Sequence, residues 1–268
     1  MPPIRCYQVD AFTDRPFAGN PAAVCLLDEP REAAWMQSVA AEMNLSETAF
    51  VRLTGDAYEL RWFTPRIEVE LCGHATLASS HALWSEGIES SEAPIRFQTL
   101  SGELTCTADG DLIRLDFPST PVTEAEPPAG LLEALQTRAS FVGRSKFDEF
   151  VCLDSEKTLR ALQPDFVRLR GIAARGIIVT SPSENPCFDF VSRFFAPAAG
   201  INEDPVTGSA HCALAHFWGG RLGKTEMTGF QASERGGTVH VRRSADRVVL
   251  GGRAVTVFRG ELASEASS

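Results

Sequence analysis

The stretch Glu203-Asp-Pro-Val-Thr-Gly-Ser-Ala-His-Cys-Ala-Leu-Ala-His-Phe-Trp218 decides the fold, because in it a polar loop passes directly into a run of small and apolar residues. Thr207-Gly-Ser209 is typical of a helix start, and Gly219-Gly220 is typical of a helix end. A helix that is apolar on nearly every side is surrounded by protein. We therefore predict a buried central helix over residues 210–218.

The same design occurs earlier in the chain, in Leu71-Cys-Gly-His-Ala-Thr-Leu-Ala-Ser-Ser-His-Ala-Leu-Trp84. Arg61-Trp-Phe-Thr-Pro65 precedes this stretch as Arg193-Phe-Phe-Ala-Pro197 precedes the later one, at an offset of 132 residues. Glu47-Thr-Ala-Phe-Val51 and Arg175-Gly-Ile-Ile-Val179 match at an offset of 128 residues. Three features in the same order indicate an internal duplication, with two strands and a helix in each half.

The duplication predicts two similar domains, at residues 1–118 and 119–257, with the last residues, about 258–268, packing back onto the first domain. Residues 121–131 are rich in Pro and Glu and form the predicted linker. Short strands outnumber helices in both halves, and one of these strands is predicted over residues 95–106. Mixed pairing of such strands indicates an α+β fold and not a doubly wound one.

Each half contributes a helix whose N-terminus emerges at a polar loop. The first N–H groups of a helix have no partner inside the helix, and the helix dipole gives that end a partial positive charge. If the two domains face one another, both helix starts meet at one cleft. We therefore expect this cleft to bind a small anionic metabolite, such as a carboxylate, although the protein as a whole is acidic.

The composition excludes several classes of function. The chain of 268 residues carries a formal net charge of -10 and has a pI near 5.1, whereas nucleic acids and anionic membranes attract clustered Lys and Arg. No run of about 18 apolar residues occurs and the N-terminus lacks a signal peptide's apolar segment, so we expect a soluble cytoplasmic protein. The seven cysteines include no Cys-x-x-Cys pair, which indicates reduced thiols.

Four polar residues near the helix starts are candidates for the chemistry. Glu47 lies at a predicted helix-to-strand junction, where its carboxylate could point into the cleft or remain a solvated turn residue. His74 follows Gly73 at the first helix start, where it could act on a substrate or complete the helix cap. Asp204 and Ser209 flank the second helix start, where an acid would face the bound anion or cap backbone N–H groups.

Cys72 is a candidate of another kind, because a helix N-terminus lowers the pKa of a nearby thiol; burial of a structural thiol would explain this residue equally well. An isomerase with two thiols would carry a second cysteine at the matching place, which is Thr207. His211 and His216 lie five residues apart and the sequence has no Cys/His cluster, so we expect no metal. The sequence also lacks activated-serine and nucleotide-binding motifs.

A set of motifs extends over nearly the whole chain: Gly19-Asn20-Pro21, Glu42-Met-Asn-Leu-Ser-Glu-Thr-Ala-Phe50, Arg61-Trp-Phe-Thr-Pro65, Leu71-Cys-Gly-His-Ala-Thr-Leu77, Glu203-Asp-Pro-Val-Thr-Gly-Ser-Ala-His211 and Gly251-Gly-Arg-Ala-Val255. Together they resemble the PhzF-like phenazine-biosynthesis family. The resemblance implies the diaminopimelate-epimerase fold, in which two similar domains each wrap a curved mixed sheet around a central helix and the active site lies between them. It also implies a homodimer and cofactor-independent acid/base isomerisation.

Carried over residue by residue, the resemblance implies that Glu47 is the catalytic proton carrier and that His74 and Asp204 support it. It implies no metal or cofactor, and it implies roles in substrate binding for Asn20, Gly73, Thr207, Gly208 and Ser209. Cys72 stands where the epimerase relatives carry their first catalytic cysteine, while Thr207 replaces the second. Two alternatives therefore stay open: an amino-acid epimerase or racemase that uses Cys72, and a catalytically idle interaction protein of the same fold.

Overall fold

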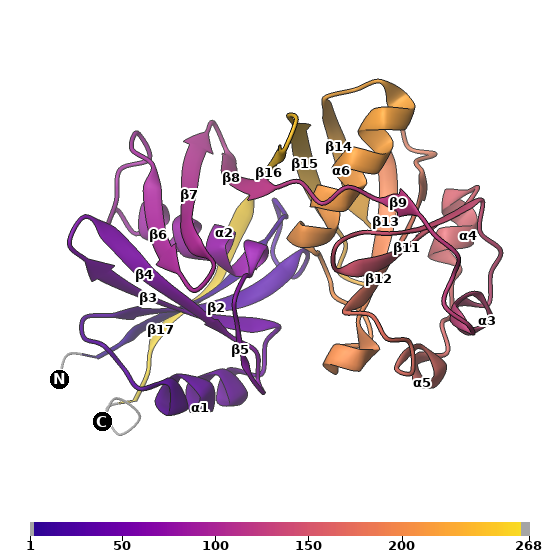
Figure 1. Cartoon of the computed structure of the whole chain (residues 1–268). Helices are drawn as coiled ribbons and strands as arrows, with labels where there is room; N and C mark the ends of the chain where they lie inside the picture. The colour runs from indigo at the N-terminus through magenta and orange to yellow at the C-terminus, as the bar shows by residue number, and fades with distance from the viewer. Residues whose placement is uncertain (1–2, 264–268) are drawn as a thin grey trace. The chain divides into compact units, whose positions relative to one another are not determined.

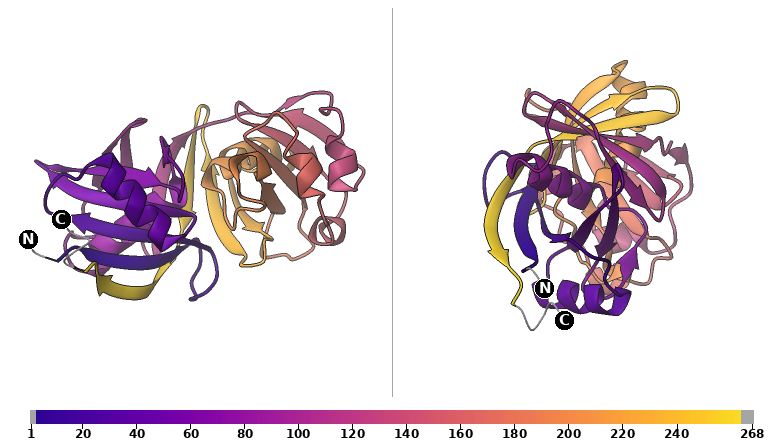
Figure 2. Two further views of the ribbon diagram at one scale, coloured as in Figure 1. Left: turned by 90° about the horizontal axis from the view of Figure 1, so that it is seen from below. Right: turned by 90° about the vertical axis from the view of Figure 1, so that its left-hand side faces the viewer.

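The computed structural model describes residues 3–263. The chain divides into two compact units: unit 1 runs to Asp116 and resumes at Gly251, and unit 2 runs from Phe117 to Leu250. Figures 1 and 2 show that each unit consists of a curved sheet and a few helices. Strands of mixed pairing outnumber helices in both units, which confirms the predicted α+β class.

The sheet of unit 1 has the strand order β17-β1-β2-β3-β4-β6-β7-β8, with β5 added beside β4. The pairs β2–β3 and β4–β6 are parallel, and the other pairs are antiparallel. The strands are β1 (Arg5–Ala11), β2 (Asn20–Leu27), β3 (Glu47–Thr54), β4 (Ala57–Phe63), β5 (Glu68–Val69), β6 (Ile95–Thr99), β7 (Gly102–Asp109), β8 (Leu112–Pro118) and β17 (Ala254–Glu261).

Helix α2 (Gly73–Ser85) packs against β1, β2, β3 and β17 and is the central helix of unit 1 (Figure 1). From His74 to Leu83 every residue except His81 is buried. Three hydroxyl groups of the helix donate hydrogen bonds to backbone carbonyls one turn earlier, so small polar residues are tolerated inside the core. Helix α1 (Ala33–Met43) covers the other face of the sheet, where Met36 and Val39 share a core with Phe50.

Unit 2 repeats the strand pairing of unit 1. Its order β9-β10-β11-β12-β13-β14-β15 contains parallel pairs at β11–β12 and β13–β14, with antiparallel pairs between them. This alternation matches β17-β1-β2-β3-β4-β6-β7, as the duplication predicts. The strands are β9 (Thr123–Glu124), β10 (Phe141–Arg144), β11 (Asp148–Cys152), β12 (Gly176–Pro182), β13 (Phe190–Phe195), β14 (Glu226–Gln231), β15 (Gly237–Arg243) and β16 (Arg247–Gly252).

Helix α6 (Gly208–Leu222) is the counterpart of α2 and is buried along most of its length. The predicted end at Gly219-Gly220 is wrong, because the helix continues to Leu222 and is followed by the C-cap Gly223, which adopts a left-handed conformation with φ 65°. A Cβ at Gly219 would lie 2.9 Å from the carbonyl oxygen of Lys224, so this glycine permits close packing. The other helices are short: α3 (Leu131–Leu135), α4 (Glu156–Arg160), α5 (Phe166–Leu169) and the 3₁₀ turn η1 (Pro197–Ala199).

A matched pair of ion pairs confirms that the two halves are built alike. In unit 1, Arg61 donates two hydrogen bonds to Glu68, at 2.7 and 2.8 Å. At the equivalent place in unit 2, Arg193 donates two to Glu203, both at 2.8 Å. Each guanidinium also lies over the phenylalanine ring two residues further along its own strand, Phe63 in β4 and Phe195 in β13. The duplicated sequence Arg-x-Phe thus makes the same contacts with a carboxylate and a phenylalanine ring in both units.

Two predictions about local structure need correction. The single strand expected over residues 95–106 is instead the hairpin β6–β7, because Gly102 has a φ of 99° and the chain turns between Thr99 and that glycine. The expected linker contains the short strand β9, which pairs with β10.

Within residues 3–263, no helix is both long and apolar enough to span a membrane.

Candidate functional site

The start of helix α2 is a buried helix N-terminus without a side-chain cap. Cys72 occupies the N-cap in an extended conformation, and its side chain accepts no hydrogen bond from the first turn. Gly73 is the first helical residue, and His74 behind it is buried. Because the first N–H groups of a helix find no partner within it, this end is suited to bind a negatively charged group.

Strand β3 begins at Glu47 and brings this carboxylate against His74. Oε2 of Glu47 lies 3.0 Å from Nε2 of His74, and the two side chains are 14% and 6% exposed. Both atoms are buried, and the contact lacks the alignment of a hydrogen bond. Catalytic acid/base contacts are often long or poorly aligned in the free enzyme and tighten around the substrate. The structure thus brings together two residues that the sequence marked separately.

The other edge of the His74 ring is also occupied. Its Nδ1 lies 3.2 Å from Nδ2 of Asn20, the first residue of β2, and 3.5 Å from Sγ of Cys72. Asn20, which the resemblance marked for substrate binding, therefore also orients the imidazole. Four residues from two strands and one helix start converge here, and we name them the unit 1 cluster: Asn20, Glu47, Cys72 and His74.

Protonation in the unit 1 cluster follows from burial and charge. Burial, together with the nearby charge of Glu47, raises the pKa of the Cys72 thiol, and this outweighs the lowering expected from the helix end. Burial alone would lower the pKa of His74, but its neighbours Cys72 and Glu47 raise that pKa well above the usual value. The contacts with Cys72 and Glu47 therefore favour the charged form of the His74 imidazole.

Glu47, Cys72 and His74 also have the residue types of a metal site, and their ligand atoms lie within 4.8 Å of one another. However, Glu47 approaches Nε2 of His74 while Cys72 approaches Nδ1. The lone pairs of these two nitrogens point away from the ring in different directions, so one ion cannot bond all three residues as they stand. This arrangement favours proton transfer over metal binding.

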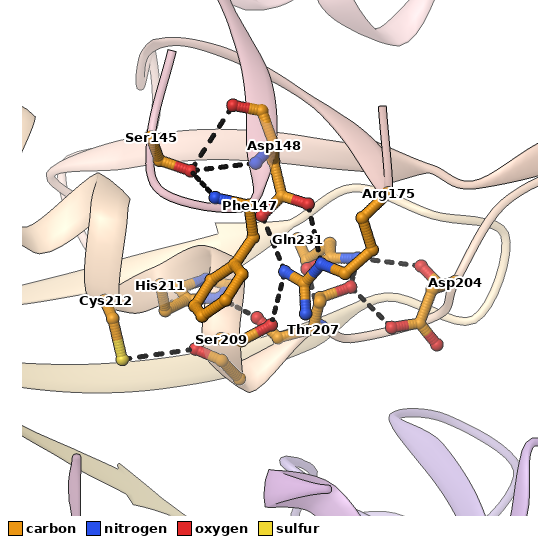
Figure 3. Close-up of polar contacts among 11 residues, drawn as sticks. Ser145, Phe147, Asp148, Arg175, Asp204, Thr207, Ser209, His211, Cys212 and Gln231 are labelled. Atoms are coloured by element: carbon orange, nitrogen blue, oxygen red, sulfur yellow. Dashed lines mark hydrogen bonds and ion pairs between the residues drawn. The ribbon is translucent and has the colours of Figure 1, made fainter. Parts of the chain in front are cut away.

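The start of helix α6 is held by a buried glutamine that the sequence analysis missed. Thr207 occupies the N-cap, but its hydroxyl donates to Oδ2 of Asp204 at 2.5 Å and does not cap the helix. Its backbone N–H donates to Oε1 of Gln231 at 2.9 Å, and Nε2 of Gln231 donates to the carbonyl of Asp204 at 2.7 Å (Figure 3). Gln231 lies on β14 and therefore fixes this loop from a distant part of the sequence.

Two further residues that the sequence analysis did not select complete the α6 start. Nη2 of Arg175 donates to Oγ of Ser209 at 3.0 Å, and the same guanidinium bonds both carboxylate oxygens of Asp148 (Figure 3). Gly208, the first helical residue, is buried beside them. The sequence offset of 128 residues aligned Arg175 with Glu47, but this alignment is wrong by one residue, because the strand registers make Gly176 the counterpart of Glu47.

His211 has a structural role in the first turn of α6. Its Nδ1 lies 2.8 Å from the carbonyl oxygen of Thr207, and the ring is fully buried. Burial lowers the pKa of His211 to about 4, so the ring is neutral and donates from Nδ1 to that carbonyl. This side chain ties the helix to its N-cap and leaves the α6 start without a histidine equivalent to His74.

Comparison with known proteins places the chain in a family. The model of the phenazine biosynthesis-like protein family matches residues 9–260. The chain belongs to this family. It is 54% identical over 257 residues to an uncharacterised isomerase of Halalkalibacterium halodurans, with 96% of this chain and 97% of the relative covered. The family assignment confirms the resemblance drawn from the motifs.

Solved structures support the same fold. A PhzF-family phenazine biosynthesis protein of Enterococcus faecalis superposes with a TM-score of 0.93 at 40% identity, covering 97% of this chain and 99% of that chain. A probable proline racemase of Agrobacterium radiobacter superposes with a TM-score of 0.66 at 11% identity, covering 97% and 93%. This chain therefore shares its fold with the PhzF-family protein and with the racemase. This confirms the epimerase-like fold that the resemblance implied.

Proposed function

We propose that this protein is a cofactor-independent isomerase that moves a carbon-bound proton within a small carboxylate-bearing metabolite. Glu47 is the proton carrier in this proposal. The observation that carries it is the contact between a half-buried carboxylate and a buried histidine at the uncapped start of a buried helix. The isomerase names of the relatives support the reaction class.

The roles of the residues follow from their charge. A carboxylate base removes a proton only from a carbon that a neighbouring carbonyl group or double bond acidifies, and negative charge then spreads over the substrate. Protonated His74 stabilises that charge, and the N–H groups at the start of α2 bind the substrate carboxylate. Glu47 returns the proton to another carbon of the same molecule, so no redox or group-transfer cofactor is required.

The matching helix start in unit 2 carries Asp204, the other acidic residue that the resemblance marks. Asp204 is anchored by Thr207 and Gln231, so its carboxylate is held in place next to the start of α6. Thr207 stands where a second catalytic thiol would be needed, and the Cys72 thiol is buried with a raised pKa. These observations speak against an epimerase that depends on paired thiolates.

The proposal is tested by proton exchange. Small acids with an activated C–H bond are incubated with the enzyme in heavy water, and NMR follows deuterium incorporation and the change of isomer. Glu47→Gln should reduce turnover by a factor of about 10² to 10⁴, the usual contribution of general acid/base catalysis. Glu59→Gln, which removes an exposed carboxylate from β4, is the control. Full turnover by a folded Glu47→Gln variant would exclude Glu47 as the base.

A further inference from the structure

Two cysteines of unit 1 lie side by side in the sheet. Cys6 on β1 and Cys25 on β2 are directly opposite one another in the antiparallel register, and their Sγ atoms are 3.4 Å apart. Both residues are buried, at 3% and 0% exposed. Opposite residues of antiparallel strands have Cα atoms about 4.5–5.5 Å apart, which lies within the range found in natural disulfides. The backbone therefore already has the spacing that a disulfide needs.

The two sulfur atoms are also close to bonding position. They have to approach by about 1.4 Å to reach the disulfide bond length of about 2.05 Å, and small rotations of both side chains share this movement. The surroundings are apolar, because the pair belongs to the core between the sheet and α1 that includes Met36 and Phe50. A disulfide has no polar group that this core would leave unpaired.

A small molecule can reach Cys6 from the side of β17. The register partner of Cys6 on that strand is Gly260, which has no side chain. The ring of Phe258 lies over this glycine, since a Cβ built there would be 2.5 Å from the end of the ring. Phe258 is itself 55% exposed, and exposed side chains change rotamer within nanoseconds. Movement of this ring opens a path along the glycine to the Cys6 sulfur.

The two thiols differ in reactivity. A hydrogen bond from the thiol of Cys25 lowers the pKa of Cys6, although burial acts in the opposite direction. The same contact, together with burial, raises the pKa of Cys25 well above the usual value. Because the thiolate is the nucleophile in thiol oxidation, Cys6 reacts first and Cys25 second.

A metal ion does not explain the pair. Two thiolates bound to one tetrahedral zinc ion, at about 2.3 Å each, have sulfur atoms about 3.8 Å apart, and such an ion needs two further ligands. Among the residues that the structure describes, the metal-ligating side chains that gather in a group of three or more are Glu47, Cys72 and His74, and neither Cys6 nor Cys25 belongs to this group.

We propose that Cys6 and Cys25 are a modification site at which hydrogen peroxide forms a reversible disulfide between β1 and β2. The Cys6 sulfur attacks one oxygen of the peroxide, the O–O bond breaks, and the leaving hydroxide takes up a proton and becomes water. The Cys25 sulfur then attacks the sulfur of the sulfenic acid formed on Cys6, the S–O bond breaks, and a second water leaves with the proton of Cys25. The two thiols lose two electrons, and one peroxide is reduced to two waters.

The new bond closes a loop that contains the start of β2. Cys6 and Cys25 are 19 residues apart, and Asn20 lies in the segment between them. The sulfur atoms lie on the α1 face of the sheet, whereas Asn20 contacts His74 on α2 at the opposite face. We therefore expect the disulfide to stabilise unit 1 without altering the unit 1 cluster. The inference does not depend on the proposed function.

The test is peptide mass spectrometry after treatment with hydrogen peroxide, in a Cys187→Ser background that lacks the exposed thiol. The peptides of Cys6 and Cys25 should become joined with the loss of two hydrogen atoms, and dithiothreitol should separate them. Cys106 is the internal control, because it is 0% exposed and burial raises its pKa to about 12. It should remain a thiol. Cys6 and Cys25 that stay reduced while Cys106 is oxidised, or a Cys6 that proceeds to sulfinic acid, would overturn the proposal.

Two variants of this background separate the disulfide from other effects of peroxide. Cys25→Ala should stop at the sulfenic acid of Cys6, which dimedone traps, and Phe258→Ala should form the disulfide faster. Three of the four tryptophans lie in unit 1, so their fluorescence follows its unfolding in urea. Closing a loop of about this length should lower the unfolding equilibrium constant about 100-fold, and peroxide should give no such gain in Cys25→Ala. An unchanged urea midpoint after oxidation would refute the link between β1 and β2, and an equal rate in Phe258→Ala would refute the access path.

Discussion

Replacement of Gln231 tests whether this buried side chain holds the loop that carries Asp204. Gln231 is fully buried and makes three hydrogen bonds: its Oε1 accepts from the N–H of Thr207, and its Nε2 donates to the carbonyl of Asp204 at 2.7 Å and to the hydroxyl of Thr207 at 3.3 Å. Gln231→Leu keeps the volume but removes the partners of a buried N–H, that of Thr207, and of a half-buried carbonyl, that of Asp204. At about 1–3 kcal/mol for each unsatisfied group, the free energy of unfolding should fall by about 2–6 kcal/mol.

Urea denaturation followed by circular dichroism measures this loss. Gln98→Leu is the control, because Gln98 lies on the exposed side of β6 and bonds only Glu103; its effect should stay within about 0.5 kcal/mol. The m-value should be unchanged in both variants, so that the midpoint alone reports stability. A Gln231→Leu protein that unfolds at the wild-type urea concentration would show that the loop does not depend on this side chain, and the account of the α6 start would be wrong.

Three further predictions follow from the described contacts. Because Cys72 and Glu47 raise the pKa of His74 in the folded protein, these contacts stabilise the fold fully below the unfolded value of about 6.5, and the effect is lost as the pH rises through the folded pKa. The unfolding free energy should therefore fall less steeply with pH in His74→Gln than in the wild type, and parallel curves from urea titrations would contradict this. Iodoacetamide at pH 7.5 should alkylate the exposed Cys187, leave the buried Cys72 unmodified and leave activity unchanged. Mass spectrometry of the peptides measures both cysteines, and early modification of Cys72 would contradict this prediction. Gly220→Ala should raise the free energy of unfolding by about 0.5–1 kcal/mol, since nothing lies near the new methyl group, whereas Gly219→Ala should lower it. If the melting temperatures of the two variants shift in the same direction, the packing described for α6 is refuted.

Much of the fold was predictable from short-range patterns. The stretches around Gly73 and Gly208 contain small and apolar residues on every side, and this composition is stable only inside a sheet that wraps around the helix. The repeated Arg-x-Phe strands predicted the duplication that the strand pairing confirms. Errors arose where a local signal was ambiguous: Gly219 looked like a helix end, although its role is close packing against another segment.

The candidate site was predictable only in part. Glu47 and His74 lie at positions where chemistry was expected, but the contact between them depends on the register of β3 against β2. Arg175 and Gln231 were missed because their partners lie 27 to 34 and 24 to 27 residues away in the sequence. No local pattern reports such a pairing.

By itself, the amino-acid sequence determined the two buried helices, their repetition and the family, because periodicity and motif order are properties of the chain that folding does not change. The tertiary structure alone decided which charges meet and which thiols keep their protons. Cys72 illustrates the reason: a helix end should lower its pKa, yet burial and the Glu47 carboxylate raise it. Desolvation and charge proximity exist only once distant strands have packed together, and the chemistry of the site depends on both.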